Sequence, residues 1–328
     1  MVGLFTIKKG SPMKNGKAIV VENVSKLFGS FRAVDDLSFE VYGGEIFAML
    51  GPNGAGKSTT IRMMLDILKP DMGSIHVLGS PITDDIKDRI GYLPEERGLY
   101  RNVKVIDMMV YLGTLKGMSK RDANKRGLEL LEQLGLGEHA KHKVSELSKG
   151  MQQKVQFAVT ILHEPQLVIV DEPFSGLDPV NTLVIKDLII KLKERGAAII
   201  MSTHQMHQVG EMADRMLMIN RGKQALYGAV DDVRNEYALH AIIVEGTGDW
   251  ITIPGVERVE DDPNSRDGML LYLEADTAPD DVLAVIARSD EYHVDRFELA
   301  VPSLNDIFIM VAGERPDKDG FLPSERED

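Results

Sequence analysis

The fold of this chain is decided by the stretch Gly51-Pro52-Asn53-Gly54-Ala55-Gly56-Lys57-Ser58-Thr59. Its first and last glycines enclose four residues and are followed by Lys and Ser, which is the pattern of a phosphate-binding loop. Residues 45–50 before it form an apolar run of strand length, and residues 60–68 after it have helical periodicity, with Pro70 just beyond. A strand, a glycine-rich turn and the start of a helix are therefore expected here.

This order of elements suits the chemistry of phosphate binding. Glycines let the backbone curl so that its N–H groups point at phosphate oxygens, and the helix N-terminus adds the positive end of its dipole. We expect Lys57 to reach the β- and γ-phosphates of a nucleotide and the Ser58 hydroxyl to bind Mg²⁺. The alternative, a chance glycine-rich turn, is disfavoured by the complete pattern and its flanks.

The composition limits the class of protein. The chain has 328 residues, of which 43% are hydrophobic and 27% charged, as in soluble globular proteins of two or three domains. No apolar stretch is long enough to cross a membrane, and the first 16 residues read as a polar extension without the apolar core of a secretory signal. Cysteine is absent, which excludes disulfides and cysteine-bound zinc and favours a cytosolic location.

The net charge of −13 is unevenly distributed. Residues 1–230 hold 30 basic and 26 acidic side chains, whereas residues 231–328 hold 8 and 25. The acidic end argues against a nucleic-acid surface there and is expected to be a solvated face followed by a polar tail.

The pattern of the chain predicts alternating strands and helices. Residues 17–48 read as an antiparallel β region, and three helices are expected at 105–115, 120–134 and 148–162. The other elements expected before residue 230 are strands at 73–79, 90–96, 167–170 and 198–201, a helix at 180–194, and a hairpin of 216–219 with 223–227.

A change in composition near Asp231 indicates a second domain, with the boundary placed at about residue 236. The elements expected there are strands at 240–245, 256–260, 269–274 and 292–300, and helices at 280–288 and 303–312. Their βββαβα order predicts a small α+β domain.

Two acidic residues, Asp171 and Glu172, follow a fully apolar strand. Sites in open α/β sheets gather at the carboxyl ends of such strands, and a phosphate loop is commonly paired with an acidic strand end. We expect Asp171 to bind Mg²⁺ and Glu172 to polarise an attacking water. The alternative is a charge pair that merely ends the strand.

At this point the chain resembles the ATP-binding subunits of ABC transporters over residues 17–230. Besides the phosphate loop and Asp171-Glu172, the matching motifs are the signature segment Leu147-Ser148-Lys149-Gly150-Met151, the D-loop Ser175-Gly176-Leu177-Asp178, the switch residue His204 and the adenine-stacking position Phe28. The resemblance implies that Ser148, Lys149, Gly150 and Asp178 also contact nucleotide. Glu95 stands where the family usually has the Q-loop glutamine, and the resemblance gives it a catalytic and metal-binding role.

The resemblance implies an α/β fold: a P-loop ATPase core of ABC type, with a mixed sheet, an antiparallel β subdomain and an inserted helical subdomain at about 96–165. It places the ATP-binding domain at 17–236, a small α+β accessory domain at 237–312 and a polar tail at 313–328. Two copies, or two paired ATPase subunits, are expected to enclose two ATP with Mg²⁺. Separate integral membrane permease subunits would then hold the pair on the inner face of the cell membrane.

The subtype is similar to the ATPases of ABC-2-type exporters that carry a C-terminal accessory domain. Two residues depart from the family pattern: Glu95 replaces a neutral glutamine, and Lys149 replaces the usual glycine. Two other functions compete with the exporter reading. One is a non-transport ABC ATPase acting on nucleic acid or ribosomes, and the other is a scaffold that binds ATP without turnover. The sequence favours the exporter ATPase, with no nucleic-acid partner.

Overall fold

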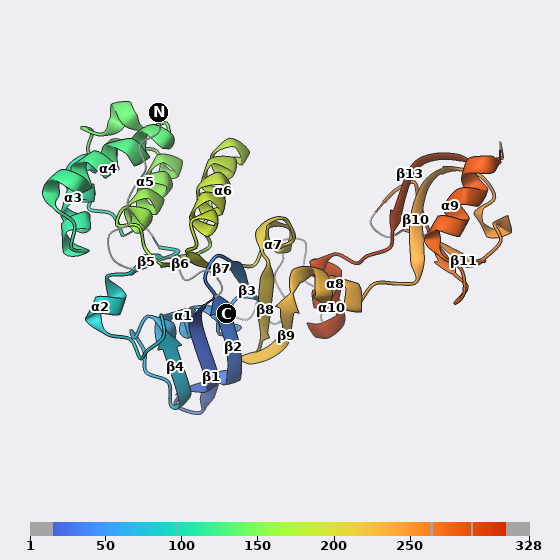
Figure 1. The fold of residues 1–328 in the computed structure, drawn as a ribbon, viewed down its shortest axis with the longest axis horizontal. Coiled ribbons are helices and arrows are strands. Elements are labelled where there is room, and N and C mark those ends of the chain that lie inside the picture. Colours follow the sequence, from blue (N-terminus) through green and yellow to red (C-terminus); the bar gives the residue numbers. More distant parts are fainter. Residues whose placement is uncertain (1–15, 97, 263–264, 290, 313–328) are drawn as a thin grey trace. The chain divides into compact units, whose positions relative to one another are not determined.

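The computed structural model describes residues 16–312, except residues 97, 263–264 and 290 (Figure 1). The polar extension expected at 1–16, apart from residue 16, and the tail expected at 313–328 lie outside the described residues. The chain divides into two compact units, one reaching Val230 and the other beginning at Asp231. The expected boundary near residue 236 falls at the end of helix α8 (Val230–Glu236), which begins at this division.

The first unit contains a six-stranded sheet in the order β5-β6-β7-β3-β8-β9, in which the pairs are parallel except for the antiparallel β8 and β9. Its strands are β3 (Ile46–Leu50), β5 (Ile90–Leu93), β6 (Leu167–Asp171), β7 (Ala198–Thr203), β8 (Arg215–Asn220) and β9 (Lys223–Ala229). Every residue of β3, β6 and β7 is buried, which explains why these strands are mainly apolar runs in the sequence.

The expected hairpin between β8 and β9 is confirmed. Its turn residues Arg221 and Gly222 have φ values of 49° and 77°. Two consecutive residues with positive φ are typical of the tight turns that match the twist of the flanking strands. Gly222 approaches its neighbours closely, because an added Cβ would lie 2.9 Å from the carbonyl oxygen of Ala33.

A second, three-stranded antiparallel sheet has the order β2-β1-β4. Its strands are β1 (Lys17–Phe28), β2 (Phe31–Tyr42) and β4 (Met72–Val77). Both β1 and β2 are longer than the expected strands, and their pairing is interrupted by register shifts between residues 21 and 27 of β1. The predicted antiparallel β region is therefore confirmed, with a longer hairpin than the sequence pattern indicated.

Helix α1 (Lys57–Met64) follows the phosphate loop but ends four residues before the expected end at Leu68. The reason is Asp66, which has a φ of 61°. Its N–H donates to the carbonyl of Met63, and the N–H of Ile67 donates to that of Arg62. These two bonds form a C-terminal cap of the Schellman type, which satisfies the last carbonyls of the helix and turns the chain away.

The remaining helices of the first unit are α2 (Asp84–Lys87), α3 (Val105–Leu115), α4 (Lys120–Gln133), α5 (Lys149–Ile161), α6 (Pro179–Glu194) and α7 (Met206–Met212), with short 3₁₀ turns at Gly137–His139 and Val144–Glu146. The three helices expected between residues 105 and 162 are confirmed to within one residue at each end. Among the residues that the structure describes, no helix combines the length and apolar character that crossing a membrane requires.

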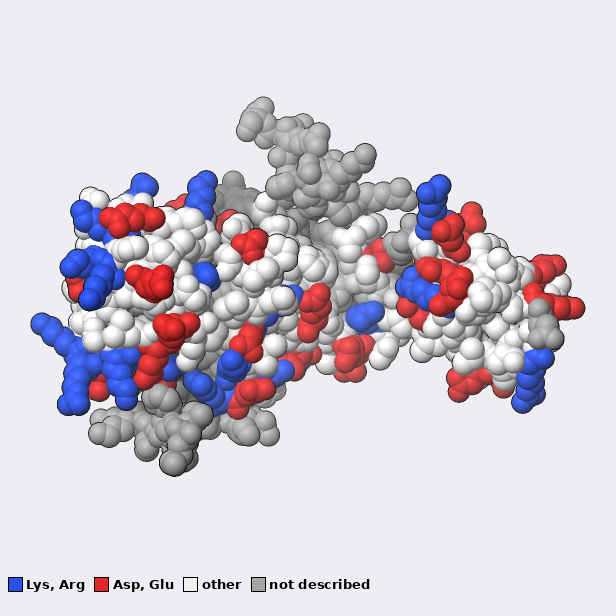
Figure 2. Space-filling model, turned by 90° about the horizontal axis from the view of Figure 1, so that it is seen from above, with Lys and Arg blue, Asp and Glu red and all other residues white. Residues whose placement is uncertain are grey.

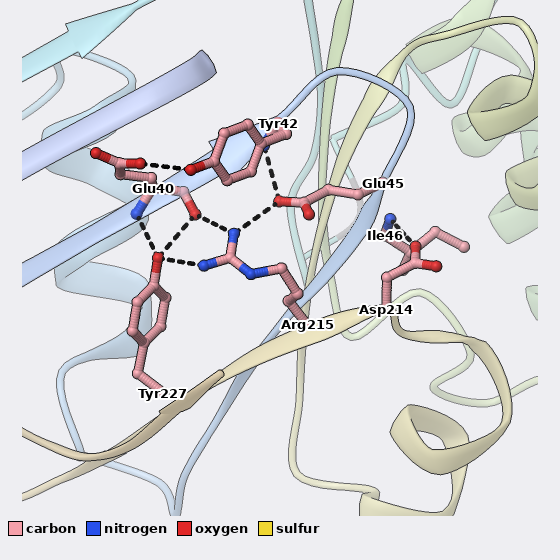
Figure 3. A network of polar contacts seen from close by, with 7 residues as sticks. All are labelled: Glu40, Tyr42, Glu45, Ile46, Asp214, Arg215 and Tyr227. Carbon is pink, nitrogen blue, oxygen red and sulfur yellow. Dashed lines mark hydrogen bonds and ion pairs between the residues drawn. The ribbon is translucent and has the colours of Figure 1, made fainter. Parts of the chain in front are cut away.

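A polar network around Arg215 connects the two sheets of the first unit (Figure 3). The Arg215 guanidinium donates from Nη1 to the carbonyl oxygen of Glu40 at 3.1 Å and to Glu45 Oε1 at 3.4 Å. It also lies over the rings of Tyr42 and Tyr227, with its central carbon 5.1 and 4.9 Å from their centroids. Arg215 therefore links strands β8 and β9 to β2 through both hydrogen bonds and cation–π contacts.

The second unit has a four-stranded antiparallel sheet in the order β11-β12-β10-β13. Its elements are β10 (Ala241–Thr247), a 3₁₀ turn (Trp250–Thr252), β11 (Val256–Asp261), β12 (Gly268–Leu273), α9 (Pro279–Arg288), β13 (His293–Leu299) and α10 (Leu304–Ala312). Helix α9 packs Val282 and Ile286 onto the sheet, beside the stacked rings of Trp250 and Tyr292. The predicted βββαβα order is confirmed.

Charged side chains of both signs are interspersed over the face shown in Figure 2. Among the residues drawn in colour there, no continuous band of one sign is seen. A mixed face of this kind is typical of a solvated surface.

Candidate functional site

The phosphate loop connects the buried strand β3 to helix α1, and two of its glycines are required by close contacts. An added Cβ on Gly51 would lie 2.2 Å from the carbonyl oxygen of Ile219, and one on Gly56 would lie 2.5 Å from that of Ala33. Their φ values of 145° and 110° also belong to the region that favours glycine. The loop is thus fitted between β2 and the β8–β9 hairpin.

Lys57 is the first residue of α1, and its side chain folds back over this loop. Its Nζ donates to the carbonyl oxygens of Gly51 at 2.6 Å and Pro52 at 2.9 Å. The side chain is buried, whereas Ser58 beside it is exposed to the pocket. An ammonium group held across the loop in this way is placed to meet a phosphate group.

Asp171 is the last residue of β6, and Glu172 follows it with a φ of 49°. The two side chains are buried, with 6% and 8% of their surface exposed. Positive φ is unusual for glutamate, and strain of this kind is found mainly where the surrounding structure holds a functional side chain. The Glu172 N–H donates to the carbonyl of Ser202 on β7 at 2.9 Å, which fixes this backbone turn.

The Glu172 carboxylate is held by residues at the end of β7. Its Oε1 accepts the backbone N–H of His204 at 2.9 Å and lies 2.7 Å from His204 Nδ1. Its Oε2 accepts the hydroxyl of Thr203 at 3.2 Å. The carboxyl ends of the neighbouring strands β6 and β7 thus bring together two residues that the sequence predicted to act at one site.

A pocket of about 460 Å³ joins these groups to residues from four other parts of the chain. Its lining consists of Phe28, Phe31, Ala33, Asn53, Gly54, Gly56, Lys57, Ser58, Thr59, Glu95, Asp171, Glu172 and His204. The phosphate loop, the acidic strand end, the switch histidine, Glu95 and the aromatic position are therefore gathered in one place.

The electrostatics of the pocket favour a cation next to Asp171. Burial raises the pKa of the Asp171 carboxyl, and the nearby carboxylates of Glu95 and Glu172 raise it further. A hydrogen bond from Ser202 and the charge of Lys57 act in the opposite direction. A site with gathered carboxylates is one in which a bound cation relieves repulsion.

The aromatic end of the pocket contains a residue that the sequence analysis missed. Phe28 is the last residue of β1, and Phe31 is the first of β2, opposite it in the hairpin. Their rings are 49% and 63% exposed, which is high for phenylalanine, and both line the pocket. The Phe28-x-x-Phe31 spacing around Gly29 was the available signal, because a two-residue turn places such residues side by side.

The signature and D-loop residues lie elsewhere. Ser148 is the N-cap of α5, where its hydroxyl accepts the N–H of Met151 at 3.3 Å, and Lys149 and Gly150 begin the helix. Asp178 caps α6, accepting the N–H of Asn181 at 2.9 Å, and this bond lowers the pKa of its carboxyl. The described lining of the pocket includes none of Ser148, Lys149, Gly150 or Asp178.

The residues predicted to bind metal fit Mg²⁺ by their chemistry. Ser58, Asp171 and Glu95 line the same pocket and offer the oxygen atoms that Mg²⁺ prefers. Among the described residues, no group of three or more acidic, histidine or cysteine side chains has metal-binding spacing. This agrees with a Mg²⁺ site of few protein ligands, completed by phosphate and water oxygens.

Comparison with known proteins identifies the family. A family model described as ABC transporter matches residues 34–175, and one described as ATP-binding protein DrrA1-3-like, C-terminal domain, matches residues 228–312. The chain is 39% identical to the uncharacterized ABC transporter ATP-binding protein YhaQ of Bacillus subtilis (strain 168), over 90% of this chain and 98% of that protein.

Two further proteins extend the likeness. The linearmycin resistance ATP-binding protein LnrL of Bacillus subtilis (strain 168) is 32% identical, over 89% of this chain and 97% of LnrL. A solved structure described as the dimeric structure of MJ0796, a bacterial ABC transporter cassette, superposes with a TM-score of 0.60 and 25% identity, covering 65% of this chain and 98% of that one.

The fold is thus that of a P-loop ATPase cassette with an added C-terminal domain. The chain belongs to the ATP-binding subunits of ABC transporters, and it is an ATPase that binds nucleotide. The resemblance recognised from the sequence motifs is confirmed.

Proposed function

We propose that this chain drives an ABC exporter as one of two ATPase subunits bound to separate membrane permease subunits on the inner face of the cell membrane. The observation that supports pairing is the separation of the motifs. The phosphate loop and Glu172 share a pocket, but the exposed residues Ser148 and Lys149 at the start of α5 do not line it. A second subunit has to supply these residues if they contact the same nucleotide.

The resistance protein LnrL and the dimeric cassette support export and pairing, since the names of both relatives carry these descriptions. In the proposed dimer, ATP lies between the phosphate loop of one subunit and the signature segment of the other. Phe28 stacks on the adenine, Lys57 contacts the phosphates, and Asp178 approaches the nucleotide across the interface. Closure on ATP and opening after hydrolysis would move the permeases.

Within each site, Glu172 orients and polarises the attacking water, while His204 holds the Glu172 carboxylate and faces the γ-phosphate. Ser58, Asp171 and Glu95 would hold Mg²⁺, which when bound neutralises charge on the phosphate oxygens. Gly51 to Thr59 cradle the phosphates through their backbone N–H groups, with Pro52, Asn53, Gly54 and Ala55 forming the turn.

The test is complementation between two inactive variants of the full chain. Lys57→Ala removes the phosphate contact, and Ser148→Arg blocks the signature face. A mixed dimer keeps one site in which an intact phosphate loop meets an intact signature segment. We expect the mixture to hydrolyse ATP although neither variant does so alone. A mixture as inactive as its components would contradict the shared site.

The second unit is proposed to support pairing or regulate it. The part of this unit that the structure describes has no metal-binding cluster, and its paired acids Asp280 and Asp281 lie in the first turn of α9. Acidic residues at this position stabilise the helix N-terminus. Export itself would be tested by the sensitivity of cells to toxic compounds after deletion of the gene together with that of its permease.

A further inference from the structure

Strand β5 is an edge strand of the six-stranded sheet, paired on one side with β6. In a parallel strand, successive carbonyls point to opposite sides, so those of Ile90 and Tyr92 point away from β6. Free edge groups of this kind need partners. The strand continues through Pro94 to Glu95, which lines the nucleotide pocket. Whatever holds this edge therefore also determines where Glu95 lies.

Helix α5 and the residue just after its C-cap supply the missing partners. The Nε2 of His163 lies 3.1 Å from the carbonyl oxygen of Ile90, and the hydroxyl of Thr160 donates to that of Tyr92 at 3.4 Å. The amide of Gln156 donates to the carbonyl oxygens of Pro94 at 3.5 Å and of Glu96 at 3.2 Å. Residues 156, 160 and 163 lie on one helix face, and the carbonyls they contact alternate along the strand.

The packing between helix and strand is close. An added Cβ on Gly91 would lie 2.4 Å from the carbonyl oxygen of Thr160, so the strand needs glycine at this point. Gln156 and Thr160 are each 6% exposed. The Oε1 of Gln156 is buried without a hydrogen-bond partner among the described atoms, so the orientation of this amide is set by its two donated bonds on either side of Glu95.

We propose that Gln156 and Thr160 are positioning residues that fix Glu95 to helix α5. The proposal rests on the proposed function, in which Glu95 binds Mg²⁺ and Ser148 contacts the nucleotide of a partner subunit. The signature segment at the start of α5 and the Glu95 segment then move as one piece. Engagement of the signature segment across the dimer is thereby transmitted to the position of Glu95 in the subunit's own pocket.

The first experiment compares Gln156→Met with the full-length wild type. Methionine has a similar shape but cannot donate, so we expect faster amide hydrogen exchange in the peptide covering residues 90–96, without ligand. We expect kcat to fall roughly tenfold, as for the loss of two hydrogen bonds, with KM for ATP changed less than twofold. The Mg²⁺ concentration for half-maximal turnover should rise.

Matched variants separate positioning from general damage. Gln166→Met removes a glutamine that bonds Arg89 at the opposite end of β5 and should change none of these quantities. Thr160→Val removes the hydroxyl bonded to Tyr92, whereas Thr160→Ser keeps it. We expect the valine variant to resemble Gln156→Met more weakly and the serine variant to behave as wild type.

The decisive measurement is a double-mutant cycle with Glu95→Ala. If Gln156 acts through Glu95, adding Gln156→Met to Glu95→Ala causes no further loss of kcat. Additive losses, or unchanged exchange in residues 90–96, would overturn the proposal. Failure of the proposed function is distinguishable, because it appears as failed complementation between Lys57→Ala and Ser148→Arg while the exchange measurement still reports on the contact of α5 with β5.

Discussion

The Nδ1 atom of His204 lies 2.7 Å from the Oε1 atom of Glu172, although 32 positions separate the two residues in the chain. The backbone N–H of His204 donates to the same oxygen. This arrangement directs one carboxylate oxygen toward the switch residue and holds the strained Glu172 backbone in place. A base that is held by its neighbours loses less entropy when it orients a water molecule.

Replacing Glu172 by glutamine should separate binding from turnover. The amide retains the size of the carboxylate but is not basic, so we expect ATP affinity to stay within about threefold and kcat to fall at least ~100-fold, the usual contribution of a general base. Equilibrium binding of ATP and release of phosphate measure the two effects. With ATP the variant should also accumulate as a dimer, seen by light scattering. Turnover equal to wild type would remove Glu172 from the proposed role.

Lys57→Ala should act on binding instead. It removes a charge-assisted contact to the phosphates worth roughly 1.5–3 kcal/mol, so ATP affinity should fall about 10- to 100-fold. The ammonium now bonds the carbonyls of Gly51 and Pro52, so the control is thermal unfolding without nucleotide. An intact melting temperature with lost binding supports the assignment. Retained ATP affinity would refute it.

The stability of the protein should depend on pH through His163. Burial, with a smaller contribution from the charge of Lys116, lowers the pKa of this imidazole from 6.5 to about 4. Because the unfolded chain takes up the proton first, the stability that the neutral ring contributes is complete above pH 6.5 and is lost as the pH falls toward 4. The slope is at most about 1.4 kcal/mol per pH unit.

The measurement for His163 is urea unfolding at several pH values for wild type and His163→Gln. Glutamine keeps an N–H donor for the Ile90 carbonyl but does not titrate. We expect the free energy of unfolding to fall less steeply with decreasing pH in the variant. Parallel curves for the two proteins between pH 6.5 and 4 would show that His163 is not responsible.

Arg215→Lys should destabilise the first unit by about 2 kcal/mol, because lysine cannot reproduce the forked contacts to Glu40, Glu45 and Tyr227. The control is Lys191→Ala, which removes an exposed pair with Asp187 and should cost no more than about 0.5 kcal/mol. Chemical denaturation followed by circular dichroism compares the two. Equal effects would mean that the network of Figure 3 contributes no more than a surface pair.

Ending the chain after Glu236 should leave ATP binding intact, because every residue that lines the nucleotide pocket precedes Val230. If the second unit supports pairing, the truncated protein should need a higher concentration to form the ATP-bound dimer. Isothermal titration with ATP and sedimentation at several protein concentrations test the two statements. A truncated chain that melts like the full protein but does not bind ATP would contradict the proposed partition.

The sequence by itself determined the class of protein, the order of most elements and the residues of the nucleotide pocket. The reason is that these depend on local chemistry: a glycine-rich turn between a strand and a helix, apolar runs for buried strands, and capping residues at helix starts. Phe28, Lys57, Asp171, Glu172 and His204 could be named because each stands in a short motif. The helix after the phosphate loop was predicted too long, since hydrophobic periodicity continues past the cap at Asp66.

The tertiary structure decided what depends on contacts between distant segments. Phe31 became part of the pocket because the hairpin places it opposite Phe28, and Gln156 reached the carbonyls beside Glu95, 60 residues away, because α5 lies along the free edge of β5. Arg215 found Glu40 across two sheets. Such contacts leave no pattern in one sequence, because hydrogen bonds to backbone carbonyls can be made by any suitably placed donor. Their partners are set by how helices and strands pack, and that is fixed by the whole core at once.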